Sequence, residues 1–263
     1  MQSYSRDLLL PYKHSLAIPR QGISYLYEPS DTEQLYKANL ERQPADWYYR
    51  HNPVTYTWNS NGYRAPEWSN VDWACTWIVM GCSHVAGIGV AEQHTLSSQL
   101  SVLLGRPCVN MGMGGSGVDV VMYNSLRLID HMIKPAGVVV VAPQLARMTY
   151  WTTKYYENLV AGFTRHEVDP YIKQAYEGFL THEPNAEMHG HMQLRGIQAL
   201  WQAEGVPIIM SHNAEGKVVK PIGLSLPDRQ DAGRDVDTIG DLATGHNGVK
   251  TLSSWATAIA NVI

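Results

Sequence analysis

The sequence predicts an α/β fold in which helices cover both faces of a central parallel sheet, giving three layers. From Trp77 onward, short apolar runs of strand length alternate with longer stretches of helical periodicity. One run, residues 137–142, contains four consecutive valines between Pro135 and Pro143, which is typical of a central strand buried on both faces. The length of 263 residues suits one domain with long additions.

Each element follows from its own pattern. Apolar residues recur at positions 118, 121, 122, 126, 129 and 133, which is the spacing of one helical face. The expected strands are residues 77–81, 108–111, 137–142 and 207–210. The expected helices are residues 95–104, 118–133, 193–204 and 249–262.

Two parts of the chain lack this alternation. Residues 1–70 are predicted to be an N-terminal extension packed on the core, and residues 71–263 to be the α/β domain. Within that domain, residues 148–190 are predicted to be an insertion after the third strand. The extension is expected to cover one edge of the sheet with its aromatic residues, which are Trp47, Tyr48, Tyr49, Tyr56 and Trp58.

Composition narrows the class of function. The formal net charge of -4 leaves no basic footprint for nucleic acid, so none is expected as a partner. No segment approaches the roughly 18 apolar residues of a membrane span, and the N-terminus does not resemble a signal peptide. Three cysteines without a C-x-x-C spacing indicate neither a disulfide framework nor a zinc site. A cytoplasmic protein without metal or organic cofactor is therefore predicted.

Polar residues follow the predicted strands. In open parallel sheets, ligands bind beyond the carboxyl ends of the strands, where the loops converge. Ser83 lies directly after the first strand, and His246 lies just before the last helix. A neutral imidazole that reaches the serine hydroxyl would activate it as a nucleophile, with a carboxylate such as Asp241 orienting the imidazole. Each residue also has an ordinary alternative role, Ser83 as a helix cap and His246 as a solvated side chain.

A tetrahedral intermediate also needs donors for its oxyanion. Residues 110–117, N-M-G-M-G-G-S-G, are dense in glycine, which lets backbone N–H groups approach a ligand. Gln144 follows the valine strand and offers a side-chain amide.

In this order, the pieces resemble the SGNH (GDSL-like) hydrolase superfamily, whose members include esterases, lipases, carbohydrate deacetylases and some acyltransferases with a flavodoxin-like fold. Residues 59–67, N-S-N-G-Y-R-A-P-E, look like the N-S-x-G-F/Y-R-x-x-E lead-in of one branch. Residues 81–83, G-C-S, correspond to the first block, G-D-S, and residues 110–115 to the second, N-x-x-x-x-G. Residues 142–144 occupy the place of the third block, and residues 246–248 resemble the fifth.

The resemblance implies roles for these residues. Ser83 would be the nucleophile that forms an acyl-enzyme, and His246 the base. The oxyanion hole would consist of the N–H groups of Ser83 and Gly115 and the amide of Gln144. Asp241 would orient His246, with Asp235 and Asp237 as alternatives, because Ala243 stands where the family has its aspartate. If no carboxylate does so, a Ser–His dyad remains.

Other residues are weaker candidates. The substrate is expected to be lined by His84, Asn110, Gly114, Arg147 and Trp151. His84 would equally suit the rim of the site, and Arg147 would either bind an anionic substrate group or tie its loop to a carboxylate. The cluster Glu187, His189 and His191 does not match the H-E-x-x-H spacing of a zinc site, so no metal is predicted.

The predicted function is hydrolysis of a small-molecule or glycan ester, with an O-acetyl carbohydrate preferred as substrate. Three alternatives stay open: an acyltransferase that uses the same site, a catalytically inactive protein with a binding or structural role, and a nucleotide-binding module. The last rests on residues 112–117, which satisfy G-x-G-x-x-G between a strand and a helix. No acidic residue follows the next strand to hold a ribose, which disfavours that module. The oligomeric state is not predicted.

Overall fold

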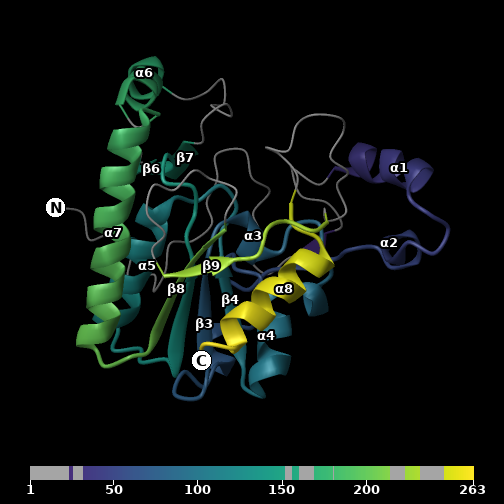
Figure 1. The fold of residues 1–263 in the computed structure, drawn as a ribbon, viewed down its shortest axis with the longest axis horizontal. Helices are drawn as coiled ribbons and strands as arrows, with labels where there is room; N and C mark the ends of the chain where they lie inside the picture. The colour runs from purple at the N-terminus through teal and green to yellow at the C-terminus, as the bar shows by residue number, and fades with distance from the viewer. Residues whose placement is uncertain are drawn as a thin grey trace.

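The computed structural model describes residues 24–25, 32–151, 156–159, 169–179, 181–213, 223–231 and 246–263. Its centre is a parallel sheet of five strands in the order β4-β3-β5-β8-β9. These strands are β3 (Trp77–Gly81), β4 (Cys108–Gly112), β5 (Gly137–Val141), β8 (Ile208–Asn213) and β9 (Leu224–Leu226). Because all pairings are parallel, the carboxyl ends of the strands share one edge, which is the upper edge in Figure 1.

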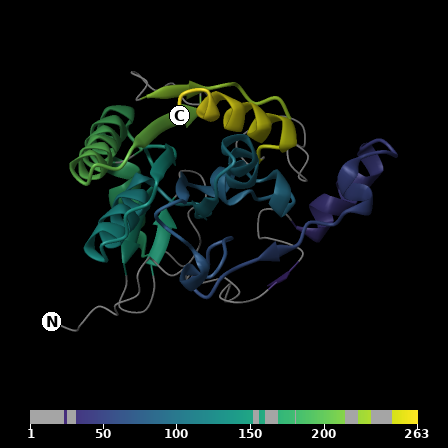
Figure 2. The same ribbon diagram turned by 90° about the horizontal axis from the view of Figure 1, so that it is seen from below.

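Helices cover both faces of the sheet (Figures 1 and 2). Helices α4 (Leu96–Leu104) and α8 (Val249–Ala260) pack on one face, and α5 (Val118–Asp130) and α7 (Glu183–Ala203) on the other. The valines of β5 alternate between the two cores, since Val139 and Val141 face α4 and α8 while Val138 and Val140 face α5 and α7. The predicted three-layer fold and its central valine strand are confirmed.

Some element boundaries differ from the predictions. Helix α7 begins at Glu183 rather than at residue 193, because its first half buries only the small residues Ala186 and Gly190 and so carries little apolar periodicity. Helix α5 ends at Asp130 rather than at residue 133, where Met132 adopts a left-handed conformation with φ of 57°. The four-residue helix α3 (Ser83–Ala86) and strand β9 are too short to show a period.

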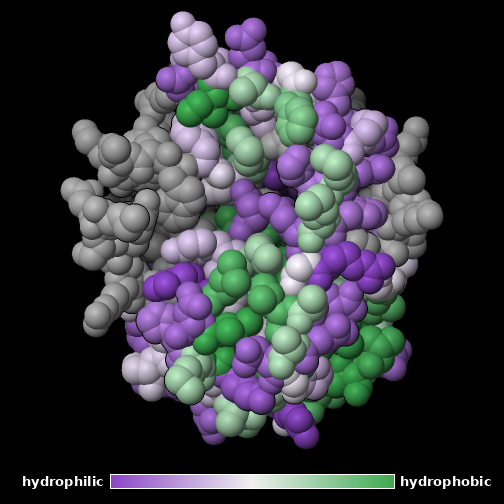
Figure 3. Space-filling view, turned by 90° about the vertical axis from the view of Figure 1, so that its left-hand side faces the viewer, coloured by the Kyte–Doolittle hydropathy of each residue, from purple (hydrophilic) through white to green (hydrophobic). Residues whose placement is uncertain are grey.

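The predicted insertion contains regular structure. Strands β6 (Met148–Trp151) and β7 (Tyr156–Leu159) form an antiparallel pair, and α6 (Pro170–Phe179) follows. Figure 1 places them above the carboxyl edge of the sheet. Helices α6 and α7 expose large apolar side chains, which are Tyr171, Phe179, Met188 and Met192. Apolar side chains also lie among hydrophilic ones on the face of the molecule in Figure 3. None of the described helices is long and apolar enough to cross a membrane.

The described part of the N-terminal extension packs beside α4 and α8. It contains β1 (Ser24–Tyr25), which pairs with β2 (Tyr56–Thr57), and the helices α1 (Glu33–Arg42) and α2 (Tyr48–His51). Two short 3-10 helices, η1 (Trp68–Asn70) and η2 (Glu92–His94), lie farther along the chain. Tyr49, Tyr56 and Trp58 are buried in the core beneath α4 and α8. These three aromatic residues therefore form part of the hydrophobic core on this face of the sheet.

Candidate active site

Ser83 is the first residue of α3, immediately beyond β3. The preceding glycine, Gly81, lies so close to its neighbours that a Cβ there would approach the side chain of Val85 at 2.6 Å and the carbonyl oxygen of Val141 at 2.7 Å. This close packing sets the sharp turn from strand to helix. Ser83 is only 9% exposed, and its N–H lies in the first turn, where helical hydrogen bonds leave N–H groups free for other acceptors.

The lead-in motif forms a closed turn. The Asn59 side chain accepts hydrogen bonds from the N–H groups of Asn61 and Tyr63 at 3.1 and 3.0 Å, and donates one to the carbonyl of Pro66 at 3.0 Å. Gly62 supplies a positive φ of 80°. The carboxylate of Glu67 closes the turn by accepting hydrogen bonds from the N–H and hydroxyl groups of Ser60. The turn presents the next motif residue, an arginine, to the nucleophile loop.

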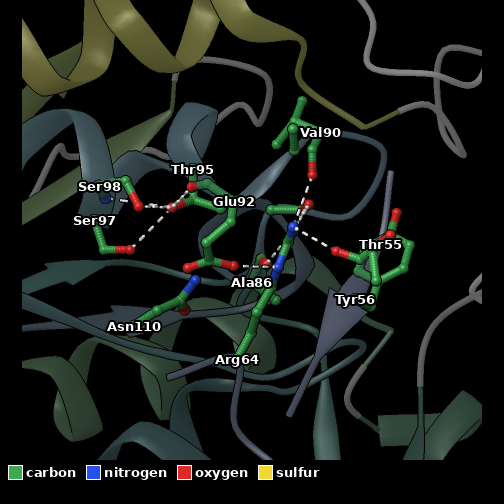
Figure 4. Close-up of polar contacts among 12 residues, drawn as sticks. Thr55, Tyr56, Arg64, Ala86, Val90, Glu92, Thr95, Ser97, Ser98 and Asn110 are labelled. Atoms are coloured by element: carbon green, nitrogen blue, oxygen red, sulfur yellow. Dashed lines mark hydrogen bonds and ion pairs between the residues drawn. The ribbon is translucent and has the colours of Figure 1, made fainter. Parts of the chain in front are cut away.

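Arg64 braces the loop that follows α3 (Figure 4). Its side chain is fully buried, and it donates hydrogen bonds to the carbonyl oxygens of Gly87 at 2.6 Å and Val90 at 3.0 Å. Its Nε lies 2.6 Å from a carboxylate oxygen of Glu92, and the guanidinium lies 4.8 Å from the centre of the Tyr56 ring. Arg64 therefore holds the turn at which α3 ends.

The glycine-rich loop after β4 is tied to the same strand end. The N–H of Met113 donates to the carbonyl of Gly81 at 3.0 Å, and the hydroxyl of Ser116 approaches that carbonyl at 3.3 Å. Gly115 has a positive φ of 74° and is half-buried, as is Gly114. The loop predicted to supply an oxyanion donor is thus fixed beside the start of α3.

Gly112 and Asn110 have structural partners. A Cβ at Gly112 would lie 2.2 Å from the backbone nitrogen of Ala86, so α3 fills the space next to this glycine. The Oδ1 atom of Asn110 accepts a hydrogen bond from the Gly112 N–H at 2.9 Å, while its buried Nδ2 makes none within the described part of the chain.

His246 lies beside the nucleophile helix. It is 8% exposed, and its ring centre lies 5.7 Å from that of His84, the residue directly after Ser83. The His84 ring in turn lies 6.1 Å from the ring of Trp255 in α8. The structure therefore brings the segments that carry Ser83 and His246 together at the carboxyl edge of the sheet.

A segment that the sequence analysis did not identify holds His246 in place. The side chain of Arg229 donates to the carbonyl of His246 at 3.3 Å. The carboxylate of Asp231 accepts hydrogen bonds from the N–H groups of Lys250 and Thr251 in the first turn of α8, at 2.9 and 3.0 Å. In the sequence, Asp231 is distant from the helix that it caps, so it does not form a local capping motif that could be recognised. The three aspartates considered as partners of His246, Asp235, Asp237 and Asp241, lie outside the described residues.

His84 lies in a positively charged environment. Burial is the main cause that lowers the pKa of His84 well below its usual value of 6.5, and nearby His246, Arg147 and Arg229 lower it further. The Nδ1 atom of His84 is buried and makes no hydrogen bond among the described residues. His84 is therefore neutral at physiological pH.

The remaining candidates fall in different places. Gln144 follows β5 with its side chain exposed, and its carbonyl accepts a hydrogen bond from the N–H of Arg147 at 3.1 Å. Trp151 is the last residue of β6, and its side chain lies outside the described part of the structure. Helix α7 carries Glu187, His189 and His191, so this cluster lies in the layer that covers the sheet.

Among known proteins, this chain is similar only to solved structures. No protein-family model and no curated protein matches the chain. A protein from Desulfitobacterium hafniense DCB-2 assigned to the G-D-S-L family of lipolytic proteins is similar in structure, with 9% identity and a TM-score of 0.44 over 72% of this chain and 99% of that one. The acetyl xylan esterase Est2A from Butyrivibrio proteoclasticus has 12% identity and a TM-score of 0.43 over 73% and 64%.

A third similar structure is a carbohydrate esterase family 2 enzyme with a carbohydrate-binding domain from Corynascus thermopiles (Myceliophthora fergusii). It has 11% identity and a TM-score of 0.39 over 71% of this chain and 64% of that one. The chain thus spans less than two thirds of the length of each of these two esterases. The description of the first of these structures names the G-D-S-L group that the motifs resemble.

Proposed function

We propose that the protein is a serine esterase that cleaves an ester through an acyl-enzyme on Ser83, with His246 as general base. The observation that carries this proposal is the 5.7 Å separation of the His246 and His84 ring centres, because His84 directly follows Ser83. A base and a nucleophile that converge at the carboxyl edge of a parallel sheet are the minimum needed for acyl transfer.

In the proposed reaction, the Ser83 hydroxyl oxygen attacks the ester carbonyl while His246 accepts the hydroxyl proton. The resulting oxyanion receives hydrogen bonds from the N–H groups of Ser83 and Gly115 and from the amide of Gln144. Loss of one such donor typically raises the barrier by about 3 to 4 kcal/mol. The tetrahedral intermediate then expels the alcohol, which takes the proton from His246. Water repeats the sequence, with His246 as base, and releases the carboxylic acid.

The proposal includes a third group that orients the imidazole of His246. Asp241 is the first candidate for this role, followed by Asp235 and Asp237. In the described segment next to His246, Asp228 is exposed, and Asp231 uses its carboxylate to cap α8. Replacing each of the three candidates by asparagine identifies the partner, since losing it should lower kcat by up to about 10⁴-fold. Equal activity in all three variants would indicate a Ser–His dyad.

The proposed substrate is a small-molecule or glycan ester, and an O-acetyl carbohydrate is preferred. Polar or charged side chains surround the start of α3, including His84 and Arg147, and an exposed amide is provided by Gln144. Such groups suit a hydroxylated alcohol part better than a long acyl chain, because apolar chains bind in apolar pockets.

The test combines labelling and kinetics. A fluorophosphonate probe should label Ser83, as located by mass spectrometry, and Ser83→Ala should abolish labelling and hydrolysis of p-nitrophenyl acetate. His246→Gln should lower kcat/KM by about 10³-fold or more. Ser69→Ala, at an exposed serine, is the matched control and should retain wild-type activity. Full hydrolysis by Ser83→Ala would overturn the proposal, and the absence of both labelling and hydrolysis would favour a catalytically inactive scaffold.

A further inference from the structure

Arg147 carries a partly buried charge that the described part of the chain does not neutralise. Its Nε and Nη1 atoms are buried and make no hydrogen bond to the described residues, and none of the ion pairs among those residues includes Arg147. A guanidinium stays protonated at physiological pH, and burying it unpaired costs free energy. A partly buried guanidinium without an acidic partner among the described residues is suited to bind an anionic ligand.

Asp119, an acidic residue close to the backbone of Arg147, does not fill this need. Asp119, in the first turn of α5, accepts hydrogen bonds from the N–H groups of Val120 and Thr149 and from the Thr149 hydroxyl. Its carboxylate is thereby engaged with backbone donors. Of the two roles that the sequence left open for Arg147, tying its loop to a carboxylate therefore finds no acid among the described residues.

Arg147 lies next to the proposed catalytic groups. Its carbonyl oxygen would be 2.6 Å from a Cβ at Gly117, so its backbone packs against the end of the glycine-rich loop. Its positive charge is close enough to His84, the neighbour of Ser83, to lower the pKa of the His84 ring. Arg229 adds a second positive charge to the same surroundings. Two guanidinium charges therefore act on the ring that directly follows the proposed nucleophile.

We propose that Arg147 binds a carboxylate of the ester substrate, so that the enzyme acts on esters of acidic molecules. This inference rests on the proposed esterase function. The guanidinium offers two parallel N–H donors that match the two oxygens of a carboxylate. The carboxylate belongs either to the alcohol part, as in an O-acetylated uronic acid, or to the acyl part, as in a succinyl ester, and the two sources are separated by the choice of substrate.

Two matched pairs of substrates test the inference. For the alcohol part, kcat/KM is compared between mono-O-acetylated methyl galacturonoside and methyl galactoside. For the acyl part, p-nitrophenyl hydrogen succinate is compared with p-nitrophenyl butyrate. In one pair the wild type should prefer the anionic substrate by about 10- to 100-fold, the range expected for a hydrogen bond between charged groups. Arg147→Gln should bring this ratio close to one, and Arg147→Lys should restore part of it.

Arg106→Gln, at an exposed arginine, is the matched control and should keep the wild-type ratio. A ratio that is the same in wild type and Arg147→Gln would overturn the inference while leaving the esterase function intact, as judged by Ser83→Ala on the neutral substrates. If Ser83 proves not to be catalytic, calorimetric titration with methyl galacturonoside and with succinate still decides. Binding of either that is at least 10-fold weaker in Arg147→Gln supports the subsite, and equal or absent binding overturns it.

Thermal unfolding separates this role from a structural one. Arg147→Met removes a partly buried charge that has no partner among the described residues and keeps most of the side-chain volume, so its Tm should equal or exceed that of the wild type. A clear fall in Tm would show that Arg147 stabilises the fold through a partner, and would overturn the inference.

Discussion

Removing the Arg64 guanidinium should destabilise the protein substantially. The side chain is fully buried and donates to the carbonyl oxygens of Gly87 and Val90 at 2.6 and 3.0 Å. Hydrogen bonds to charged groups contribute about 1.5 to 3 kcal/mol each, so Arg64→Met should lower the free energy of unfolding by about 3 to 6 kcal/mol. Domains are stabilised by only about 5 to 15 kcal/mol in total. With about 2 to 4 °C per kcal/mol, Tm should fall by roughly 6 to 24 °C.

The assay is urea and thermal unfolding followed by circular dichroism. Arg64→Lys keeps the charge but reaches fewer acceptors, so its loss of stability should be smaller. It also keeps the prediction measurable if Arg64→Met does not fold. Arg106→Met, at an exposed position, should change the free energy of unfolding by no more than about 0.5 kcal/mol. A loss below about 1 kcal/mol for Arg64→Met would refute the argument that this side chain braces the nucleophile loop.

Two further predictions concern α3. Gly112→Ala would place a Cβ 2.2 Å from the Ala86 nitrogen, so α3 must shift. We expect the free energy of unfolding to fall by about 1 to 3 kcal/mol and the esterase activity to fall at least 10-fold. Wild-type values in both assays would contradict this packing. The pKa of His84 is lowered in the fold from 6.5, so protons bind the unfolded chain more tightly at this site. Its contribution to stability is therefore intact above about pH 6.5 and is lost as pH falls from there through the folded-state pKa. In urea unfolding at pH 8 and pH 5, His84→Gln should lose less stability on acidification than the wild type, and equal losses would show that His84 does not titrate in this way.

The fold could be predicted where the burial of an element produces a recognisable pattern of apolar residues in the local sequence. The four valines of β5 record burial on both faces of the sheet, and the spacing in α5 records one buried face. Helix α3 and strand β9 span too few residues to display any period. The first half of α7 was missed for a different reason. At Gly190 the helix packs so closely that a Cβ would meet the Leu145 side chain at 2.6 Å, and a glycine contact leaves no apolar signal.

The candidate site divides in the same way. Ser83 and the glycine-rich loop directly follow strands, so the topology of a parallel sheet already places them at one edge. Arg229 and Asp231 could not be predicted in this way, because their partners, His246 and the first turn of α8, are distant in the sequence. A side chain that supports a site through long-range hydrogen bonds is recognised only when the contact itself is seen.

The lead-in and the first block of the predicted family pattern are one physical unit. The turn at residues 59–67 holds Arg64, and Arg64 spans the space to the carbonyl groups behind α3. Gly87 must adopt its left-handed conformation, with φ of 71°, for α3 to end there, and a Cβ at this position would lie 3.3 Å from an Arg64 nitrogen. The arginine and the glycine therefore constrain each other. Two motifs separated in the sequence occur together because the buried guanidinium needs those carbonyl acceptors and the loop that positions Ser83 needs the brace.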